Sequence, residues 1–194
     1  CNNNYDNLKE ILINNMVNIG RKYSRCGFGG SFFKWIISDN HEPYNSYGNG
    51  AAMRVSACGL VAKNIEEAKY ISKIVTEISH NHPEAIKAAE AISVSIFMAS
   101  HGYKMNDIKS YIMKNYYNIN FTLDEIRNTY EFNITCQGSV PQALEAFFES
   151  KSFEDAIRNA ISIGGDSDTI AAITGSIASA YYGVPNNLRK KALS

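Results

Sequence analysis

The sequence predicts an all-α protein built from many helices. Two patterns indicate this class: apolar residues recur at helical spacing in several segments, and residues that cap helices stand in front of most of these segments. Apolar and polar residues alternate only in a weak strand-like piece at residues 131–136. No internal repeat is visible, so we expect unequal helices packed around a core rather than a solenoid.

The composition is that of one ordinary globular domain, which we expect to span residues 1–194. The formal net charge is zero, which disfavours nucleic acid as a partner. The longest uncharged run is rich in Ser, Thr and Gly, so we expect no membrane partner. The cysteines are far apart and no signal-peptide pattern opens the chain, which favours free thiols in a cytoplasmic protein; they are Cys1, Cys26, Cys58 and Cys136. The absence of an initiating Met leads us to expect a fragment or a processed form.

Helices in the first half of the chain are predicted at residues 6–23, 32–37, 51–61, 64–79 and 83–100. The segment 32–37 is apolar nearly all round and is therefore expected to be buried. Asn64 with Glu67, and Pro83 in a first turn, mark two of the helix starts. A glycine-rich turn at residues 25–31 and a polar loop at residues 38–50 connect the first three helices.

Helices in the second half are predicted at residues 106–116, 122–130, 139–149 and 152–161, followed by a last helix after Thr169. Thr122 with Glu125 forms a capping-box pattern. Ser139 with Gln142, and Ser152 with Asp155, mark the starts of two further helices. The last helix has no charged residue after Thr169 and ends at Gly183 and Pro185, which predicts a buried helix that approaches its neighbours closely.

The clearest chemical signal is the segment 164–169, Gly-Gly-Asp-Ser-Asp-Thr, which we call the aspartate turn. It brings two carboxylates and a hydroxyl, from Asp166, Asp168 and Thr169, to the point where a loop enters a buried helix. Mg²⁺ prefers such oxygen ligands and keeps several waters, so a magnesium site is the favoured interpretation. The alternative is that the aspartates only cap the helix, but capping requires one of them rather than both.

Residues 44–50, Tyr-Asn-Ser-Tyr-Gly-Asn-Gly, form a polar loop ahead of a helix of small residues, which we call the glycine loop. Such a loop can offer backbone N–H groups to phosphates and a tyrosine ring to a base or sugar, although most loops of this composition are turns. The turn at residues 25–31 also has two interpretations. It binds around a diphosphate, or it is only a tight connection between two helices, which is the more frequent case. His80 and His82 precede a helix, where capping is the ordinary role and lining a ligand site is the alternative.

Taken together, these stretches resemble the ADP-ribosylglycohydrolase family, the metal-dependent all-α hydrolases of the DraG and ARH type. Residues 45–54 resemble the substrate loop and following helix of that family, residues 79–84 its histidine motif, and residues 164–169 its C-terminal metal motif. The order and spacing of the three motifs also match. The resemblance implies a compact multi-helix orthogonal bundle of the ADP-ribosylglycohydrolase type.

The resemblance also implies an activity and a set of site residues. The activity is hydrolysis at the anomeric carbon of the ribose, which releases ADP-ribose from an ADP-ribosylated protein or nucleotide. A pair of Mg²⁺ ions would be bound by Asp166, Asp168 and Thr169. ADP-ribose would be held by Ser46, Tyr47, Gly48 and Asn49, with His80 lining the site and with Gly27, Phe28, Gly29 and Gly30 along the diphosphate.

One part of the family pattern is missing from the sequence. Family members carry an N-terminal Thr-Asp-Asp-Thr metal motif and an upstream acidic catalytic residue, and neither is present here. The metal ligand set is therefore incomplete and the catalytic base is unassigned. Three explanations are open. A segment has been lost or cleaved, or another chain or a homo-oligomer completes the site, or the chain is an inactive remnant. The alternative function is a catalytically inactive ADP-ribose-binding or regulatory protein.

Overall fold

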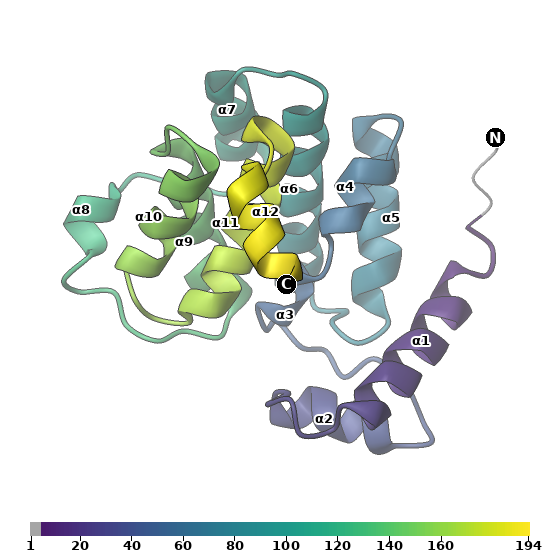
Figure 1. The fold of residues 1–194 in the computed structure, drawn as a ribbon. Coiled ribbons are helices and arrows are strands. Elements are labelled where there is room, and N and C mark those ends of the chain that lie inside the picture. Colours follow the sequence, from purple (N-terminus) through teal and green to yellow (C-terminus); the bar gives the residue numbers. More distant parts are fainter. Residues whose placement is uncertain (1–4) are drawn as a thin grey trace.

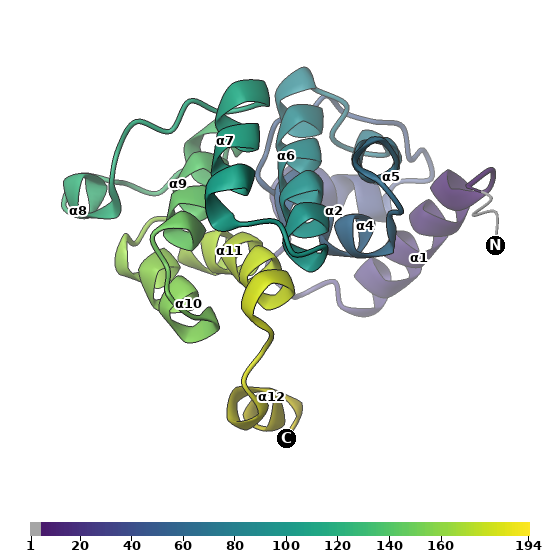
Figure 2. The same cartoon turned by 90° about the horizontal axis from the view of Figure 1, so that it is seen from above.

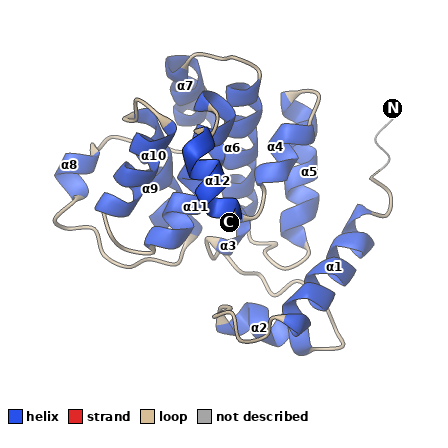
Figure 3. Ribbon diagram, in the orientation of Figure 1, coloured by secondary structure: helices blue, strands red, loops and turns tan. Residues whose placement is uncertain are grey.

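Every regular element among residues 5–194 is an α-helix, as the sequence predicts (Figure 3). The computed structural model describes residues 5–194, so the prediction for Cys1 lies outside the described residues. Within this range no strand forms, and the only β-type pairing there is an isolated bridge between Gly48 and Thr135. The all-α class is confirmed, and the strand-like piece at residues 131–136 does not become a strand.

The helices run through the whole described chain and are connected by loops of varied length. Their bounds are α1 Leu8–Lys22, α2 Gly30–Ile37, α3 Gly50–Met53, α4 Ser56–Val61, α5 Ile65–Glu77, α6 Pro83–Ser100, α7 Met105–Asn115, α8 Leu123–Ile126, α9 Cys136–Phe148, α10 Phe153–Ser162, α11 Ser167–Tyr182 and α12 Asn186–Leu193.

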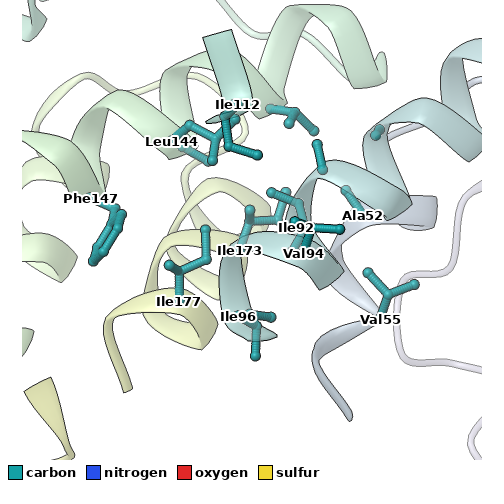
Figure 4. Packing of buried hydrophobic residues seen from close by; sticks show 14 of the residues in the cluster. Ala52, Val55, Ile92, Val94, Ile96, Ile112, Leu144, Phe147, Ile173 and Ile177 are labelled. Atoms are coloured by element: carbon teal, nitrogen blue, oxygen red, sulfur yellow. The ribbon is translucent and has the colours of Figure 1, made fainter. Parts of the chain in front are cut away.

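Helix α6 is the central element of the fold (Figures 1 and 2). It contacts α3, α4, α5, α7, α9 and α11, and its alanine and serine side chains are buried on nearly every side. Figure 4 shows Ile92 and Ile96 of α6 beside Ile173 and Ile177 of α11, with Phe147 of α9 nearby. All five side chains are fully buried, and each contributes about 1.5–3 kcal/mol relative to an exposed position. This core fixes α11, and the start of α11 carries the aspartate turn.

A second, smaller cluster joins α1 and α2 to the end of α5. Val17 of α1, Trp35 and Ile36 of α2, and Ile78 are its buried members. Gly20 permits the contact, because a Cβ at this position would lie 2.6 Å from Cδ1 of Ile36. Figure 1 shows these two helices together beside the main body of the fold.

The predicted helix at residues 51–61 is wrong as a single element, because it divides into α3 and α4 at Arg54 and Val55. The Arg54 side chain explains the break. Its Nε donates to the carbonyl oxygen of Gly50, the first residue of α3, over 2.7 Å, and so a side chain satisfies a carbonyl of this short helix. The chain turns at Val55 before α4 begins.

Other predicted boundaries also change, and one helix was not predicted. Helix α9 begins at Cys136 rather than Ser139, because the Thr135 hydroxyl accepts a hydrogen bond from the N–H of Gly138 at 3.1 Å and caps it. Helix α8 ends at Ile126 instead of continuing to residue 130. Helix α12 follows Pro185, where no helix is predicted, and it has no buried residue.

Most predicted start signals are confirmed. Asn64 accepts from the N–H of Glu67 at 2.8 Å, and Ser152 accepts from the N–H of Asp155 at 3.1 Å. Thr122 and Glu125 form both hydrogen bonds of a capping box. Pro83 occupies the first turn of α6, and Gly183 ends α11 with a positive φ of 73°.

Two compositional predictions concern the described part of the chain. Cys26, Cys58 and Cys136 are free there, and burial raises the pKa of both Cys58 and Cys136 to about 12. These two buried thiols are therefore protonated and unreactive near neutral pH. No helix among residues 5–194 has the length and apolar character needed to span a bilayer.

Candidate functional site

The glycine loop is anchored by the segment that leads into α9. The N–H of Asn49 donates to the carbonyl oxygen of Ile134 over 2.8 Å, and the N–H of Cys136 donates to the carbonyl oxygen of Tyr47 over 2.8 Å. The N–H of Gly48 donates to the Ser46 hydroxyl over 3.1 Å. The N–H groups of Gly48 and Asn49 are thus already used inside the protein, and any phosphate at this loop must bind to other donors.

The side chain of Asn49 connects the glycine loop to the aspartate turn. Its amide nitrogen lies 2.6 Å from Oδ2 of Asp166 and 3.0 Å from the hydroxyl of Ser139, and a longer contact of 3.5 Å reaches the carbonyl oxygen of Asn133. Asn49 is buried, so these hydrogen bonds are protected from water. Two predicted site segments that are far apart in the sequence therefore meet through one side chain.

The aspartate turn owes its shape to two glycines. Gly164 and Gly165 have φ angles of 73° and 67°, which residues with a Cβ rarely adopt. A Cβ on Gly165 would also overlap the ring of Tyr130, whose hydroxyl donates to the carbonyl oxygen of Gly138 over 2.7 Å. Tyr130 therefore holds the turn against the start of α9, next to Ser139.

The two carboxyl groups of the turn influence each other. Burial raises the pKa of Asp166, the Asn49 hydrogen bond opposes this, and the neighbouring Asp168 raises the pKa further. The contact with Asp166 lowers the pKa of the exposed Asp168, and the backbone N–H of Thr169 lowers it as well. The pair therefore concentrates negative charge at the start of α11, where a cation is the natural counter-charge.

The capping interpretation of these residues finds little support. Asp166 occupies the position that precedes α11, but its side chain makes no capping hydrogen bond. Thr169 is buried; its hydroxyl contacts the sulfur of Met53 at 3.8 Å and is hydrogen-bonded to the Asp166 carboxylate, which lowers the pKa of Asp166. Two carboxylates and a hydroxyl fit part of the shell of one hydrated Mg²⁺ ion. Within residues 5–194, no group of three or more His, Cys, Asp or Glu side chains gathers at any place that suits a metal.

His80 lies on the other side of the glycine loop and is buried. Its Nδ1 is 2.8 Å from the hydroxyl of Ser79 and 3.3 Å from Nη2 of Arg54. Burial, followed by the charge of Arg54, lowers the pKa of His80 to about 3, so the imidazole is neutral at physiological pH. His82 has the ordinary role instead, because its Nδ1 accepts from the N–H of Glu84 at 3.1 Å and caps α6.

The turn at Gly27–Gly30 lies apart from the glycine loop and reaches it indirectly. Gly29 precedes α2 and Gly30 begins it, and a Cβ on Gly27, Gly29 or Gly30 would meet nothing within 4 Å. Phe28 stacks edge-on against Phe32 at 5.6 Å between ring centroids, and the Phe32 ring lies 5.2 Å from the guanidinium carbon of Arg54. These aromatic rings and Arg54 thus connect the turn to the glycine loop indirectly. Their predicted place beside a diphosphate stays a prediction.

Four side chains that build this region were not predicted as site residues: Arg54, Ser79, Tyr130 and Ser139. Each acts through a partner distant in sequence, so no local pattern marks its role. Arg54 offers the strongest signal, because it is a charged residue in an otherwise small and apolar run at residues 51–61. Two surface hollows, beside α1 and beside the start of α5, are lined by none of the predicted site residues.

The Gly165→Ala variant is expected to lose about 2–3 kcal/mol of unfolding free energy, because it combines a disfavoured φ with overlap of the Tyr130 ring. Gly164→Ala is the matched control. Its φ is also positive, but a Cβ there meets nothing within 4 Å, so a loss of only about 1 kcal/mol is expected. Urea unfolding measures both. Equal losses in the two variants would show that Tyr130 does not constrain the turn.

Comparison with known proteins places this arrangement in a family. Residues 11–193 match the family model described as ADP-ribosylglycohydrolase. The ADP-ribosylarginine hydrolase Tri1 of Pseudomonas putida is 24% identical over 152 residues, which cover 75% of this chain and 41% of that protein. The ADP-ribosylhydrolase ARH3 of Gallus gallus is 25% identical over 184 residues, which cover 71% of this chain and 50% of that protein.

The fold has a counterpart among solved structures. A structure titled "ADP-ribosylglycohydrolase-related protein complex" superimposes with a TM-score of 0.70 at 20% identity, covering 94% of this chain and 71% of that one. This similarity confirms the predicted type of helical bundle. The chain spans about half the length of the curated relatives it matches. Because the family model covers nearly all of its residues, the chain belongs to the ADP-ribosylglycohydrolase family.

Proposed function

We propose that this chain provides the ADP-ribose-binding face of a Mg²⁺-dependent ADP-ribosyl hydrolase. The substrate class is an ADP-ribosylated protein or nucleotide, and the product is free ADP-ribose. The observation that carries the proposal is the 2.6 Å hydrogen bond between the Asn49 amide and the Asp166 carboxylate. It places a loop suited to a nucleotide sugar beside two carboxylates suited to a divalent cation, as hydrolysis at the anomeric carbon requires.

Different residues would bind the metal, stack on the nucleotide and line the loop. Asp166, Asp168 and Thr169 would hold Mg²⁺, and Asn49 keeps Oδ2 of Asp166 fixed. A bound Mg²⁺ supplies positive charge that polarises sugar hydroxyls and water. The exposed ring of Tyr47 offers a face for stacking with a base or sugar. His80 stays neutral and lines the loop rather than transferring a proton.

The second candidate is an ADP-ribose-binding protein without hydrolytic activity. The observation that favours it is the sparse metal shell, because the described residues offer only two carboxylates and one hydroxyl at this place. A partial shell weakens the hold on Mg²⁺ more than it weakens contacts between the glycine loop and the nucleotide. In this case ADP-ribose binding would not depend on the metal.

The test uses the 194-residue chain itself. Its two substrates are a protein that carries ADP-ribose on arginine and an ADP-ribosylated nucleotide. Release of ADP-ribose that requires added Mg²⁺ and stops with EDTA is the expected result. Calorimetry with ADP-ribose, with and without Mg²⁺, runs in parallel. Metal-independent binding without release would favour the second candidate, and the absence of both binding and release would reject both functions for this chain.

A further inference from the structure

We propose that Arg54, together with Ser79, fixes His80 as the neutral tautomer that carries its proton on Nε2 and directs that proton toward the glycine loop. His80 would then be a permanent hydrogen-bond donor for an anionic oxygen of the ligand, and Arg54 a positioning residue that acts through it. The ligand part of this inference rests on the proposed function, whereas the tautomer does not.

The tautomer follows from the partners of Nδ1. A guanidinium group has only donors, and Nη2 of Arg54 lies 3.3 Å from Nδ1 of His80, so Nδ1 must be an acceptor. The hydroxyl of Ser79 accepts from Nη1 of Arg54 at 3.0 Å, lies 2.8 Å from Nδ1 and also contacts Tyr44, and it can donate its own proton to Nδ1. A proton on Nδ1 would face the N–H donor of Arg54, and it therefore belongs on Nε2.

The opposite side of the ring faces the glycine loop. Nε2 of His80 lies 3.6 Å from the position of a Cβ on Gly48 and 3.5 Å from that of a Cβ on Gly50. Neither glycine fills this space with a side chain. Among residues 5–194, none forms a hydrogen bond with Nε2, although Nδ1 has two partners. The donor is therefore free for a ligand that enters beside these glycines.

Arg54 is itself held rigidly. Its Nε donates to the carbonyl oxygen of Gly50 over 2.7 Å, and its guanidinium carbon lies 5.2 Å from the centre of the Phe32 ring. None of these contacts is a carboxylate, so the positive charge beneath the loop is not neutralised by them. An anionic ligand oxygen at Nε2 would be attracted by this charge as well as by the imidazole proton.

The surroundings also keep His80 from becoming charged. The titratable groups that face the ring are Arg54 and Tyr44, whose ring centroid lies 5.5 Å from that of His80. Burial raises the pKa of Tyr44, so this side chain supplies no negative charge. An imidazolium would lie beside the guanidinium of Arg54 without any counter-charge. The ring therefore remains a neutral donor.

The test is ¹⁵N–¹H multiple-bond NMR on the ¹⁵N-labelled chain, recorded from about pH 5 to about pH 8. The His80 signals are assigned by their loss in His80→Gln. We expect a neutral ring protonated on Nε2 throughout. Arg54→Met should release the ring into exchange between tautomers, while Arg21→Met, which removes a guanidinium bound to the carbonyl oxygens of Ile36 and Ser38, should change nothing.

A proton on Nδ1 in the unaltered chain, or a titration midpoint near neutral pH, would overturn the inference whether or not Arg54→Met folds. Ser79→Ala removes the other partner of Nδ1, and the Nε2 tautomer should persist through the remaining donor, Arg54. Loss of that tautomer in Ser79→Ala would overturn the positioning role of Arg54. ADP-ribose affinity should fall on the order of tenfold in Arg54→Met and in His80→Gln, and the double variant should lose less than the two single losses combined. If the unaltered chain does not bind ADP-ribose, the proposed function fails, while the spectrum still decides the tautomer.

Discussion

Replacing Asp166 with asparagine is expected to weaken Mg²⁺ binding by about tenfold or more, and to make the metal-free protein more stable. The amide is nearly isosteric, and its oxygen can still accept from Asn49, so the shape of the turn is kept while one of two carboxylate charges is lost. The stability gain follows from the pKa of Asp166, which burial and Asp168 raise in the folded protein. A carboxylate with a raised pKa opposes folding once the pH exceeds that pKa, and asparagine removes this cost.

Calorimetric titration with Mg²⁺ and thermal unfolding with and without Mg²⁺ measure the two effects. The unaltered chain should unfold at a higher temperature with Mg²⁺, and Asp166→Asn should lose most of that increase. Asp107→Asn is the control for a loss of charge near a helix start, because Asp107 lies exposed in the first turn of α7 and is the one acidic residue there. Unchanged Mg²⁺ affinity in Asp166→Asn, or no binding by the unaltered chain at millimolar Mg²⁺, would contradict the metal assignment.

Elements whose signals are local were predictable from the sequence. Ser152 caps α10 through a bond to Asp155 three residues away, and Thr122 does the same with Glu125, so both starts can be found in four residues of sequence. The start of α9 shows the limit of this approach. Thr135 and Ser139 are both plausible caps, and the choice falls on Thr135 because the N–H of Cys136 is bound to the distant carbonyl oxygen of Tyr47.

Other parts of the fold could not be predicted from the sequence. Some depend on tertiary contacts, and others leave no periodic pattern of apolar residues. The break between α3 and α4 depends on where the Arg54 side chain turns, and helical periodicity does not report this. Helix α12 buries no residue, so it has no apolar stripe to detect.

The candidate site also combines features that are visible in the sequence with features that only the structure shows. The chemistry of the aspartate turn was visible because Asp166 and Asp168 are near neighbours in sequence. Its contact with Asn49, 117 residues away, was not visible, and neither was the support from Ser139. The resemblance to a family supplied the grouping of the motifs, while the hydrogen bonds that hold them together required the structure.

The Lys109→Met variant is expected to destabilise the protein by about 2–3 kcal/mol at neutral pH, and by less as the pH falls. Glu145 of α9 is 3% exposed, and both of its carboxylate oxygens accept from Nζ of Lys109 at 2.9 Å. Methionine keeps an apolar stem of similar length but removes the ammonium, which also lies 5.3 Å from the centre of the Phe148 ring, and so leaves a buried carboxylate without its counter-charge. The expected loss is below that of a fully buried pair because a third of the Lys109 side chain is exposed.

The pH dependence follows from the pKa of Glu145, which burial already raises and Lys109 pulls down. Without Lys109 this pKa rises further, so the folded variant binds a proton that the unfolded chain releases. The lost stability is therefore recovered as the pH falls through the raised pKa toward the ordinary value of about 4.3. Urea unfolding near pH 8 and pH 5 measures the difference, with Lys114→Met on the same helix as a control that has no ion pair with Glu145. Adding Glu145→Gln to Lys109→Met should abolish the extra pH dependence, and an equal loss at both pH values in the single variant would contradict the assignment to Glu145.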